Sequence, residues 1–600
     1  MVLRTSVLLM WLSLIIACDE GGSGIPVIPT GGNGDGSLVV GLVADGAMSA
    51  SLSKSVAAFN VRLFETPPSS LDKKPYFQSG CVPFNSFFEL SNLPVGNRWV
   101  VAFDGYSSDT CAEGSAVAFG LRGEVQVVKK AAGDTSNGPY HYVQVNEKGA
   151  FTPFPLPGPE LNPVHGGVTC TSDDVCKTQL HPAARCTGGV CRLSSLFPLN
   201  TRERRAFHSA VEVSDRVVLV GGHNAASAGQ VEVRQPGTET FDPSSGLFGA
   251  EPVANLSNEH AFAPAVVLEE DHKVVLLGGV PKMGMVKAKE GWLPAMTPQA
   301  CTGPDKCNIG LSNLANVWSV DSGSAVASPL PYSGAAGCAA AVVAPDGGIG
   351  VLVRPGLVQT AKGTVEYGTK AYLCRLDESD VLACDEVKGA GAARGLSTGV
   401  CFTEGPGACL DYLILGGGPS GKDGADFAEV YTAGDGAIHR LLSTGALPKA
   451  LIGAVAVKVA GAIYTFGGVD DSGAGVGPLK IAVDPAAGKI TVTQVQVGKD
   501  VDSLLRVLHQ VTPLADTSRV LVTGGLGKDW QPLDTAVVLS ISSDGVVKVE
   551  ANLRLSVARL GHAATLVTRG LLKGMVLVTG GFQSLGDTAS FADGAEVFLP

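Results

Sequence analysis

The strongest constraint on the fold is a short apolar strand that ends in two glycines and recurs along the last two thirds of the 600-residue chain. A motif that returns at a fixed period predicts a repeat architecture, in which each unit buries its apolar face against its neighbours. The strands have sequences such as VVLVGG and VLVTGG. The six glycine pairs are Gly221 and Gly222, Gly278 and Gly279, Gly416 and Gly417, Gly467 and Gly468, Gly524 and Gly525, and Gly580 and Gly581.

The spacing of the pairs gives the number of units. The pairs end at positions 222, 279, 417, 468, 525 and 581, so the intervals are 57, 138, 51, 57 and 56 residues. The long interval has room for two units. Within it, GIGVLVRPG (348–356) stands where a strand is expected, with Pro355 and Gly356 in place of the glycine pair. The pattern therefore predicts seven units.

Two further motifs recur in phase with the glycine pairs. After the pair comes a third strand and a tight turn, of which DPSSG (242–246) is one example. Proline fixes φ in such a turn and glycine supplies a positive φ. A fourth strand follows, so each unit has four strands. The second motif, Arg-x-x-His, precedes three of the pairs as Arg205 and His208, Arg506 and His509, and Arg559 and His562.

The glycine pairs, together with third strands such as FAEVYTAGDG (427–436), resemble the kelch repeat in its galactose-oxidase-like form. The resemblance covers residues 192–600 and implies a seven-bladed β-propeller. It departs from the family in two respects: only five Trp occur in the chain, and the third unit is degenerate. The sequence ends after a third strand. We therefore expect residues 192–199 to add the fourth strand of the last blade, which would leave no open sheet edge.

Residues 37–152 lack the repeat and carry short alternating apolar runs typical of strands. The run FFELSNLPVGNRWVVAFDG (87–105) resembles the centre of transthyretin-like and Cna-B-like modules, which are small β-sandwiches used as spacers or adhesion modules. The expected fold class is all-β, with this β-sandwich preceding the propeller. Residues 153–191 are expected to form a proline-rich linker and a disulfide clasp.

The first residues predict export and a lipid anchor. Residues 1–17 hold one cation, Arg4, and an apolar run too short to span a bilayer comfortably, as in a signal peptide. The run ends in Ile-Ile-Ala-Cys18, which resembles the bacterial lipobox. The resemblance implies cleavage before Cys18 and acylation of that residue, and several acyl chains give a lasting anchor. Residues 18–36 would then be the lipidated Cys and a Gly-rich tether in the bacterial cell envelope, in either membrane leaflet. The alternative is an ordinary cleaved signal.

Export would place the other cysteines of the fourteen in a compartment that favours disulfides. Cys338 lies in an alanine-rich stretch and is expected to be a buried free thiol. The quartet between 170 and 191 lacks the CxxC spacing of zinc sites, so two disulfides of open connectivity are favoured over zinc. The candidates are Cys81 with Cys111, the quartet Cys170, Cys176, Cys186 and Cys191, Cys301 with Cys307, Cys374 with Cys384, and Cys401 with Cys409.

Charge and motifs exclude several functions. The net charge of −12 disfavours a phosphate-binding surface, so nucleic acid is not an expected partner. No GxSxG, HExxH or P-loop pattern occurs. No motif joins two tyrosines to two histidines, as the copper site of galactose oxidase would require, and no cofactor is expected. The histidines at 208, 509 and 562 are expected to bond neighbouring blades rather than a metal. The partner arginines are expected to pair with Glu239, Glu429 and Glu596.

The remaining candidates lie on loops expected at one face of the propeller. Trp292 lies in an insertion (280–315), and the loops that follow two later glycine pairs contain Asp470, Asp529 and Trp530. Exposed aromatic residues suit protein or glycan contact, although they also serve in plain loop packing. The sequence therefore predicts a membrane-anchored, non-catalytic scaffold for an unknown protein or glycan. The alternative is a carbohydrate-active or galactose-oxidase-like propeller enzyme.

Overall fold

The computed structural model describes most of the chain, with gaps at both ends of the N-terminal part and in several loops. The described residues are 26–44, 47–48, 52–65, 74–85, 87–95, 98–129, 140–154, 171–172, 184–187, 190–193, 204–227, 230–232, 238–248, 260–288, 291–294, 310–335, 337–391, 393–418, 427–443, 451–470, 472–497, 502–586, 589–592 and 594–600.

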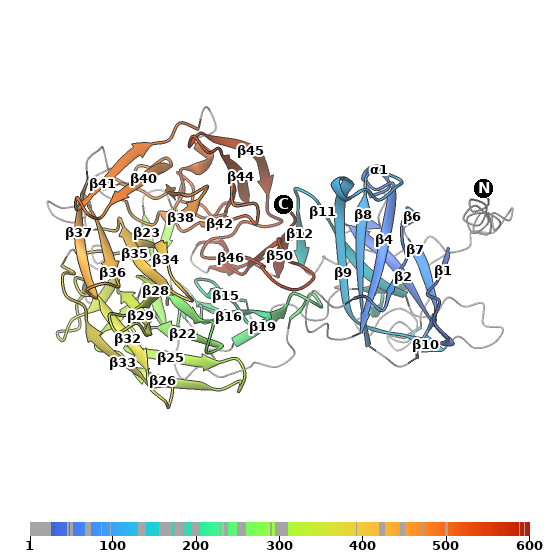
Figure 1. Ribbon diagram of the computed structural model, residues 1–600, viewed down its shortest axis with the longest axis horizontal. Helices are drawn as coiled ribbons and strands as arrows, with labels where there is room; N and C mark the ends of the chain where they lie inside the picture. Colours follow the sequence, from blue (N-terminus) through green and yellow to red (C-terminus); the bar gives the residue numbers. More distant parts are fainter. Residues whose placement is uncertain are drawn as a thin grey trace, which may run out of the picture.

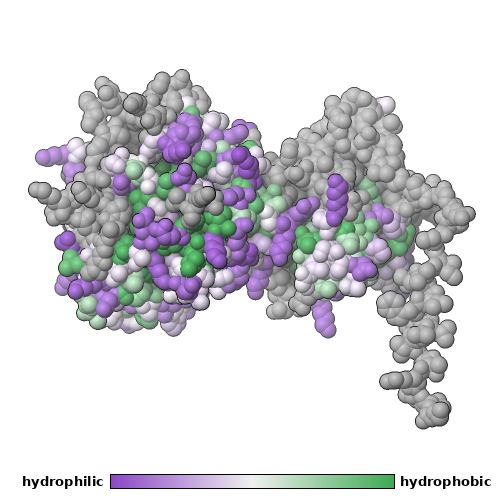
Figure 2. Space-filling view, turned by 90° about the horizontal axis from the view of Figure 1, so that it is seen from above, coloured by the Kyte–Doolittle hydropathy of each residue, from purple (hydrophilic) through white to green (hydrophobic). Residues whose placement is uncertain are grey.

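The chain is all-β, as the sequence predicts. Helix is limited, within the described ranges, to α1 (Leu52–Ser55) and two 3-10 turns, Glu113–Ser115 and 502–504. No helix in the described part has the length and apolar character needed to cross a membrane. Figure 1 shows an N-terminal sheet in blue beside a rounded array of sheets that runs from green to red. Figure 2 shows hydrophilic and hydrophobic residues intermixed over the visible, non-grey surface of both parts.

The N-terminal strands form one hydrogen-bonded sheet around a single apolar core that includes Phe59, Phe88 and Trp99. β2 is bonded to both β7 and β11, so these strands belong to one continuous sheet, and the expected β-sandwich stays a prediction. The strand order is β1-β7-β2-β11-β9-β8-β4-β5, with β3 and β10 on β2 and β6 on β4. The bounds are β1 (Val27–Pro29), β2 (Gly36–Ala44), β3 (Ala47–Met48), β4 (Ala58–Glu65), β5 (Phe77–Gln78), β6 (Val82–Pro83), β7 (Phe87–Leu93), β8 (Arg98–Tyr106), β9 (Ala116–Gln126), β10 (Val128–Lys129) and β11 (Tyr140–Glu147).

Within each expected unit the repeat strands pair antiparallel in sets of four, and the strand before the glycine pair or its Pro-Gly replacement is second. The sets of the third, fourth and fifth units are joined into one 12-stranded sheet by two short parallel contacts, β28 with β35 and β37 with β41. In unit order the sets are β15 (Ser209–Val213), β16 (Arg216–Val220), β19 (Thr238–Asp242) and β20 (Leu247–Phe248); β21 (Ala265–Leu268), β22 (Lys273–Leu277), β25 (Leu314–Ser319) and β26 (Ala325–Pro329); β28 (Cys338–Val343), β29 (Ile349–Arg354), β32 (Tyr372–Leu376) and β33 (Leu382–Glu386); β34 (Thr398–Glu404), β35 (Cys409–Leu415), β36 (Phe427–Thr432) and β37 (Ala437–Ser443); β38 (Val455–Val459), β39 (Ala462–Phe466), β40 (Leu479–Asp484) and β41 (Lys489–Gln494); β42 (Gln510–Pro513), β43 (Arg519–Thr523), β44 (Thr535–Ile541) and β45 (Val547–Arg554); β46 (Ala563–Leu566), β47 (Val576–Thr579), β50 (Ala595–Phe598) and β12 (Phe151–Phe154).

Shorter strands connect or cover these sets. They form one four-stranded sheet, one three-stranded sheet and two hairpins. Their bounds are β17 (Ala225–Ser227), β18 (Gln230–Glu232), β23 (Lys282–Ala288) and β24 (Gly291–Pro294); β27 (Ser333–Ala335), β30 (Leu357–Gln359) and β31 (Val365–Tyr367); β13 (Ala184–Thr187) with β14 (Val190–Leu193); and β48 (Phe582–Ser584) with β49 (Ser590–Phe591).

The last set corrects the expectation that residues 192–199 complete it. Its fourth strand is β12, which follows the N-terminal sheet and pairs antiparallel with β50. Phe151 packs against Phe598 with ring centroids 5.0 Å apart, and Gly149 N–H donates to the Leu599 carbonyl at 2.7 Å. The described end of the 192–199 segment belongs instead to the β13–β14 hairpin. The fourth strand of the last set therefore comes from an earlier segment than expected, and the apolar packing of Phe151 favours it at this position.

Each glycine pair is a joint between consecutive units. Gly524 has φ 53°, and a side chain there would collide with the backbone carbonyl oxygen of Arg559 in the next unit. Gly525 N–H donates to that same oxygen at 2.8 Å. Only glycine permits so close a backbone approach at a positive φ. The same donor bond joins Gly222 to His260, Gly279 to Gly334, Gly417 to Leu451, Gly468 to Arg506 and Gly581 to Arg205.

The joint made by Gly581 connects the last unit to the first. Phe207 N–H also donates to the Gly561 carbonyl at 2.6 Å, and the Thr565 hydroxyl donates to the Ala210 carbonyl at 3.0 Å. Units far apart in sequence are therefore adjacent in space, with the same kind of joint that links sequential units.

Candidate functional site

The three in-phase histidines lie at these joints. His208 Nε2 is 2.8 Å from the Thr579 hydroxyl, and His562 Nε2 is 2.8 Å from the Thr523 hydroxyl. At the third joint, the residue before the glycine pair is Phe466 instead of threonine. His509 packs against Gly467 of that pair. Burial lowers the pKa of His509 and His562 to about 3 and that of His208 well below its usual value. All three imidazoles are therefore neutral at pH 7.

Two of the three in-phase arginines pair with carboxylates as expected. Arg205 is 3.0 Å from Glu239, and Arg559 is 2.9 Å from Glu596. Arg506 differs, because Val537 occupies the register position that Glu239 has in the first unit and Glu596 in the last. Its guanidinium donates instead to backbone carbonyls, among them that of Gly524 at 3.0 Å. Burial lowers the pKa of Arg506 to about 10.

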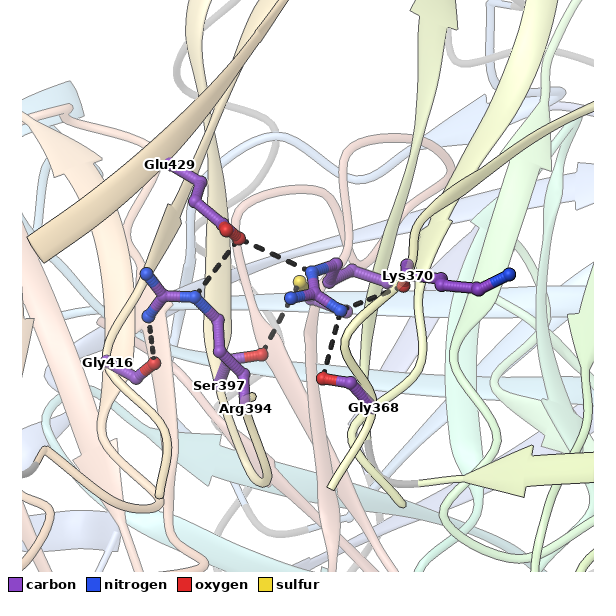
Figure 3. A network of polar contacts seen from close by, with 8 residues as sticks. Gly368, Lys370, Arg394, Ser397, Gly416 and Glu429 are labelled. Atoms are coloured by element: carbon purple, nitrogen blue, oxygen red, sulfur yellow. Dashed lines mark hydrogen bonds and ion pairs between the residues drawn. The ribbon is translucent and has the colours of Figure 1, made fainter. Parts of the chain in front are cut away.

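The third expected carboxylate, Glu429, lies between two arginines that the sequence reasoning missed. Glu429 is 3.1 Å from Arg394 and 3.3 Å from Arg354. Figure 3 shows Glu429 and Arg394 next to each other. Arg394 precedes Ser397 at the spacing of Arg-x-x-His. A search for this motif that allowed serine in place of histidine would have identified Arg394. Arg354 replaces the last apolar residue before the degenerate Pro-Gly pair. All three side chains are fully buried.

Cys338 occupies the position of the joint histidine in the third unit. It is buried, unpaired and 3.8 Å from the Ser397 hydroxyl. Burial raises the pKa of its thiol, so it remains protonated. The expected free thiol is thus confirmed. Of the expected disulfides, the described residues confirm Cys81–Cys111, Cys374–Cys384 and Cys401–Cys409.

The other cysteine predictions stay predictions. Cys186 and Cys191 are backbone partners across the β13–β14 hairpin. The remaining candidates, Cys18, Cys170, Cys176, Cys301 and Cys307, lie outside the described residues.

The residues just before the first strand of each unit form a ring of sharp corners. Four corners carry a large apolar residue with a positive φ: Phe207 at 56°, Phe262 at 55°, Leu396 at 54° and Leu508 at 54°. The other three corners carry glycine, at Gly337, Gly453 and Gly561. A left-handed backbone costs a non-glycine residue roughly 1–2 kcal/mol, and such outliers cluster at ligand sites. The four side chains are thus retained where glycine would be the less strained choice.

All seven corners line one cavity of about 280 Å³. Apart from the neutral histidines, its lining has no ionisable side chain. The Phe207 and Phe262 rings stack at its edge, with centroids 3.6 Å apart. The half-buried Gln510 carboxamide also lines the cavity, and it makes no hydrogen bond to any residue that the structure describes. Gln510 therefore offers the cavity a free donor and a free acceptor beside an apolar wall.

The expected binding-face residues lie apart from this cavity. Trp292 is in β24, within a hairpin rather than an irregular loop. The Asp470 carboxylate accepts bonds from the Ser472 hydroxyl at 2.6 Å and the Ala474 N–H at 3.0 Å; these bonds lower its pKa, and they satisfy it within its own turn. Asp529 accepts from the Gln531 N–H, and Trp530 is partly buried against an apolar cluster. Asp470 and Trp530 thus have local structural partners.

The described residues do not form a site for copper, the metal that a galactose-oxidase-like fold implies. No group of three His, Cys, Asp or Glu among them could hold a metal ion. Copper favours imidazole nitrogens as ligands. The Nε2 atoms of His208 and His562 face threonine hydroxyls, and their Nδ1 atoms are buried without a partner in the described part. We therefore derive no step through copper.

No family model and no curated protein matches the chain. Solved structures do match. One is a fungal alcohol oxidase of the AA5 family in complex with copper, at 13% identity and a TM-score of 0.42, over 67% of this chain and 75% of that one. Another is YjhT, at 12% identity and a TM-score of 0.37, over 59% of this chain and 99% of that one. Both are similar to this chain in all-β fold.

This comparison corrects the prediction of a non-catalytic scaffold and of a chain that is not an enzyme. The matched alcohol oxidase is an enzyme, in the class that the sequence offered only as its alternative. At this level the similarity assigns neither a substrate nor a catalytic residue to the chain.

Proposed function

We propose that residues 204–600, with β12, form a seven-bladed kelch-type β-propeller, and that the cavity at its corners is the active site of a carbohydrate-active enzyme. Its substrate would be a small, uncharged, hydroxyl-bearing compound such as a sugar or another alcohol. The observation that carries the proposal is the unpartnered Gln510 carboxamide in a cavity lined by all seven units. A closed ring brings every unit to one central point, which makes such a cavity a natural ligand site.

The chemistry of the lining supports this substrate class. A cavity without formal charge disfavours ionic ligands, which would lose hydration without gaining a counter-charge. The volume of about 280 Å³ is near the lower end for ligand pockets, so it suits a monosaccharide-sized compound. The carboxamide can both donate to and accept from a hydroxyl group. Phe207 and Phe262 offer apolar faces to the C–H groups of the same molecule.

Turnover of a panel of neutral monosaccharides and polyols, followed by NMR of the reaction mixture, tests the proposal. We expect one class to be consumed, with the Gln510→Leu variant about tenfold weaker in binding, the equivalent of one hydrogen bond. Gln496→Leu is the matched control, because Gln496 is exposed and outside the cavity. Absence of turnover across the panel, or equal behaviour of the two variants, would contradict the proposal.

We also propose that the chain is an exported lipoprotein anchored through Cys18, and that its N-terminal sheet is a transthyretin-like or Cna-B-like spacer. The signal-like residues 1–17 and the lipobox-like end at Cys18 support the anchor. Incorporation of labelled palmitate in a bacterial host tests it. Labelling should disappear in Cys18→Ala, and labelling that persists would refute lipidation at this residue.

A further inference from the structure

The tether after Cys18 is shorter than the sequence indicates. Residues 18–36 are expected to be a free tether, yet Val27, Ile28 and Pro29 pair in parallel with Glu89, Leu90 and Ser91. Thr30 extends this contact by donating to the Ser91 carbonyl at 2.8 Å. Only residues 19–26 therefore separate Cys18 from the first strand of the sheet.

Exposed apolar side chains gather along this same edge. Six large hydrophobic residues of the described chain are exposed, and three of them are in the N-terminal part. Val27 lies in β1, Tyr76 just before β5 and Val95 just after β7. The segment from Val27 to Gly36 runs between them: the Cβ position of Gly32 is 3.0 Å from the Tyr76 hydroxyl oxygen, and that of Gly36 is 3.0 Å from a Val95 methyl group. The three side chains thus flank one continuous stretch of chain.

The chemistry of this edge suits a membrane interface. The Tyr76 ring is held by the buried Trp99 ring, with centroids 4.8 Å apart, and Lys74 is exposed two residues before it. Tyrosine is enriched where hydrocarbon meets headgroups, and a lysine near an anionic surface contributes about 1 kcal/mol. β1 is the edge strand and lies at the end of the sheet that faces away from the repeat units (Figure 1).

The short tether restricts what can cover this edge. The nine Cα–Cα steps from Cys18 to Val27 span about 16 Å on average for a Gly-rich chain, and about 30 Å when fully extended. A lipid on Cys18 therefore keeps Val27 near the bilayer. Strand pairing with a second copy is disfavoured, because β1 has three residues, ends in Pro29 and follows Pro26.

We propose that the edge formed by Val27, Lys74, Tyr76 and Val95, hereafter the membrane edge, docks on the lipid surface. The inference rests on the anchoring through Cys18 proposed above. It gives the N-terminal sheet a fixed orientation, with the membrane edge on the bilayer and the repeat units held away from it. The sheet is then a spacer of fixed orientation that holds the propeller away from the membrane, rather than a domain on a flexible tether.

Site-specific labelling of the full-length, lipidated protein tests this orientation. Val95→Cys and Val546→Cys place a thiol at sites with equal exposure, 44% and 45%, on the membrane edge and on the sixth unit. Cys18 carries the lipid and Cys338 is buried. Label taken up by the unsubstituted protein is measured and subtracted, because the pairing of six other cysteines stays a prediction. Each labelled protein is reconstituted into phosphatidylethanolamine–phosphatidylglycerol vesicles, and quenching of the fluorophore by spin-labelled lipid is measured.

We expect quenching several-fold stronger at position 95 than at position 546. Equal quenching in protein that co-sediments with the vesicles would overturn the docking while leaving the anchor intact. Failure to co-sediment would refute the anchor, and the docking with it. A concentration-dependent blue shift at position 95 without lipid would identify a second copy as the occupant and would likewise overturn the proposal.

Discussion

At the residue scale, buried charge is placed where the units meet. Glu429 is fully buried between the guanidinium groups of Arg354 and Arg394, so one carboxylate serves two units. A buried pair adds little net stability compared with apolar residues, but removing one partner leaves a charge in a low-dielectric site. These side chains are therefore sensitive positions even though they are far from any expected catalytic role.

Replacing Glu429 with glutamine tests this view. The substitution leaves both guanidinium groups facing a neutral amide, and we expect a loss of about 3–5 kcal/mol in the free energy of unfolding, measured by urea denaturation. The matched control is Glu404→Gln, which removes an exposed pair with Lys458 at 3.0 Å and should cost less than about 1 kcal/mol. Equal losses for the two variants would contradict the argument.

The buried histidines predict a pH dependence of stability. Burial lowers the pKa of His223 and His260 to about 4 and of His509 and His562 to about 3, below the ordinary value near 6.5. Between these values the unfolded chain binds protons that the folded chain does not, so folding is favoured above pH 6.5 and loses stability as the pH falls toward 3. Each histidine contributes up to about 1.4 kcal/mol per pH unit.

Unfolding curves between pH 6.5 and 4 measure this slope. We expect His562→Gln to reduce it by about one proton, whatever the variant does to stability at pH 7. An unchanged slope would show that His562 is not kept neutral by the fold.

At the element scale, the sequence predicts the units well and their closure poorly. The glycine pairs, the turns and the degenerate strand at 348–356 are local patterns, and each lies where the spacing indicates. The fourth strand of the last set depends instead on a contact between Phe151 and Phe598, far apart in sequence, for which the sequence carries no local signal. The sequence does not predict the cavity for the same reason, because Gln510 becomes part of a cavity only when the seven corners meet in the folded chain.

The glycine pairs predict a specific cost for adding a methyl group. Gly524→Ala would strain a left-handed backbone and also push apart two units, so we expect a loss of at least about 3 kcal/mol. Gly488 is the matched control: its φ is 63°, but no atom lies within 4 Å of its Cβ position, so Gly488→Ala should cost about 1 kcal/mol. Thermal unfolding of both variants measures the difference, and similar values would mean that backbone strain alone explains the motif.

The β12 strand gives a second prediction at this scale. Phe151→Ala removes its ring contact with Phe598, so we expect faster hydrogen exchange in β46, β47 and β50. Phe248→Ala is the matched control, since Phe248 also lies on an outer strand and packs 4.9 Å from Phe241, but in the first unit. An equal increase of hydrogen exchange in β46 in both variants would contradict the role of β12 in stabilising the last unit.

At the scale of the whole molecule, the contacts between the last and first units decide whether the array is closed. The Glu212 carboxylate accepts bonds from the Thr568 hydroxyl at 2.7 Å, the Thr568 N–H at 2.8 Å and the Arg569 N–H at 3.1 Å. These bonds, with the Gly581 joint and β12, hold together two units that no short linker connects. In the proposed propeller these contacts leave no terminal unit to cap, unlike in an open array.

Closure predicts that one kind of bond has different consequences at different joints. Thr565 and Thr512 each donate a hydroxyl bond to the next unit, at 3.0 Å to Ala210 and 3.2 Å to Ala564. Substitution by valine removes about 1 kcal/mol of stability in either case. After Thr512→Val, units 6 and 7 are still joined covalently by the chain between them. After Thr565→Val, units 7 and 1 are held together by non-covalent contacts.

We therefore expect Thr565→Val to increase hydrogen exchange in β15 and β46 together, and Thr512→Val to leave local exchange in β42 and β46 close to the wild type. Equal local effects at the two joints would mean that the array does not open at the junction of units 7 and 1, and that its ends are held as firmly as any interior pair.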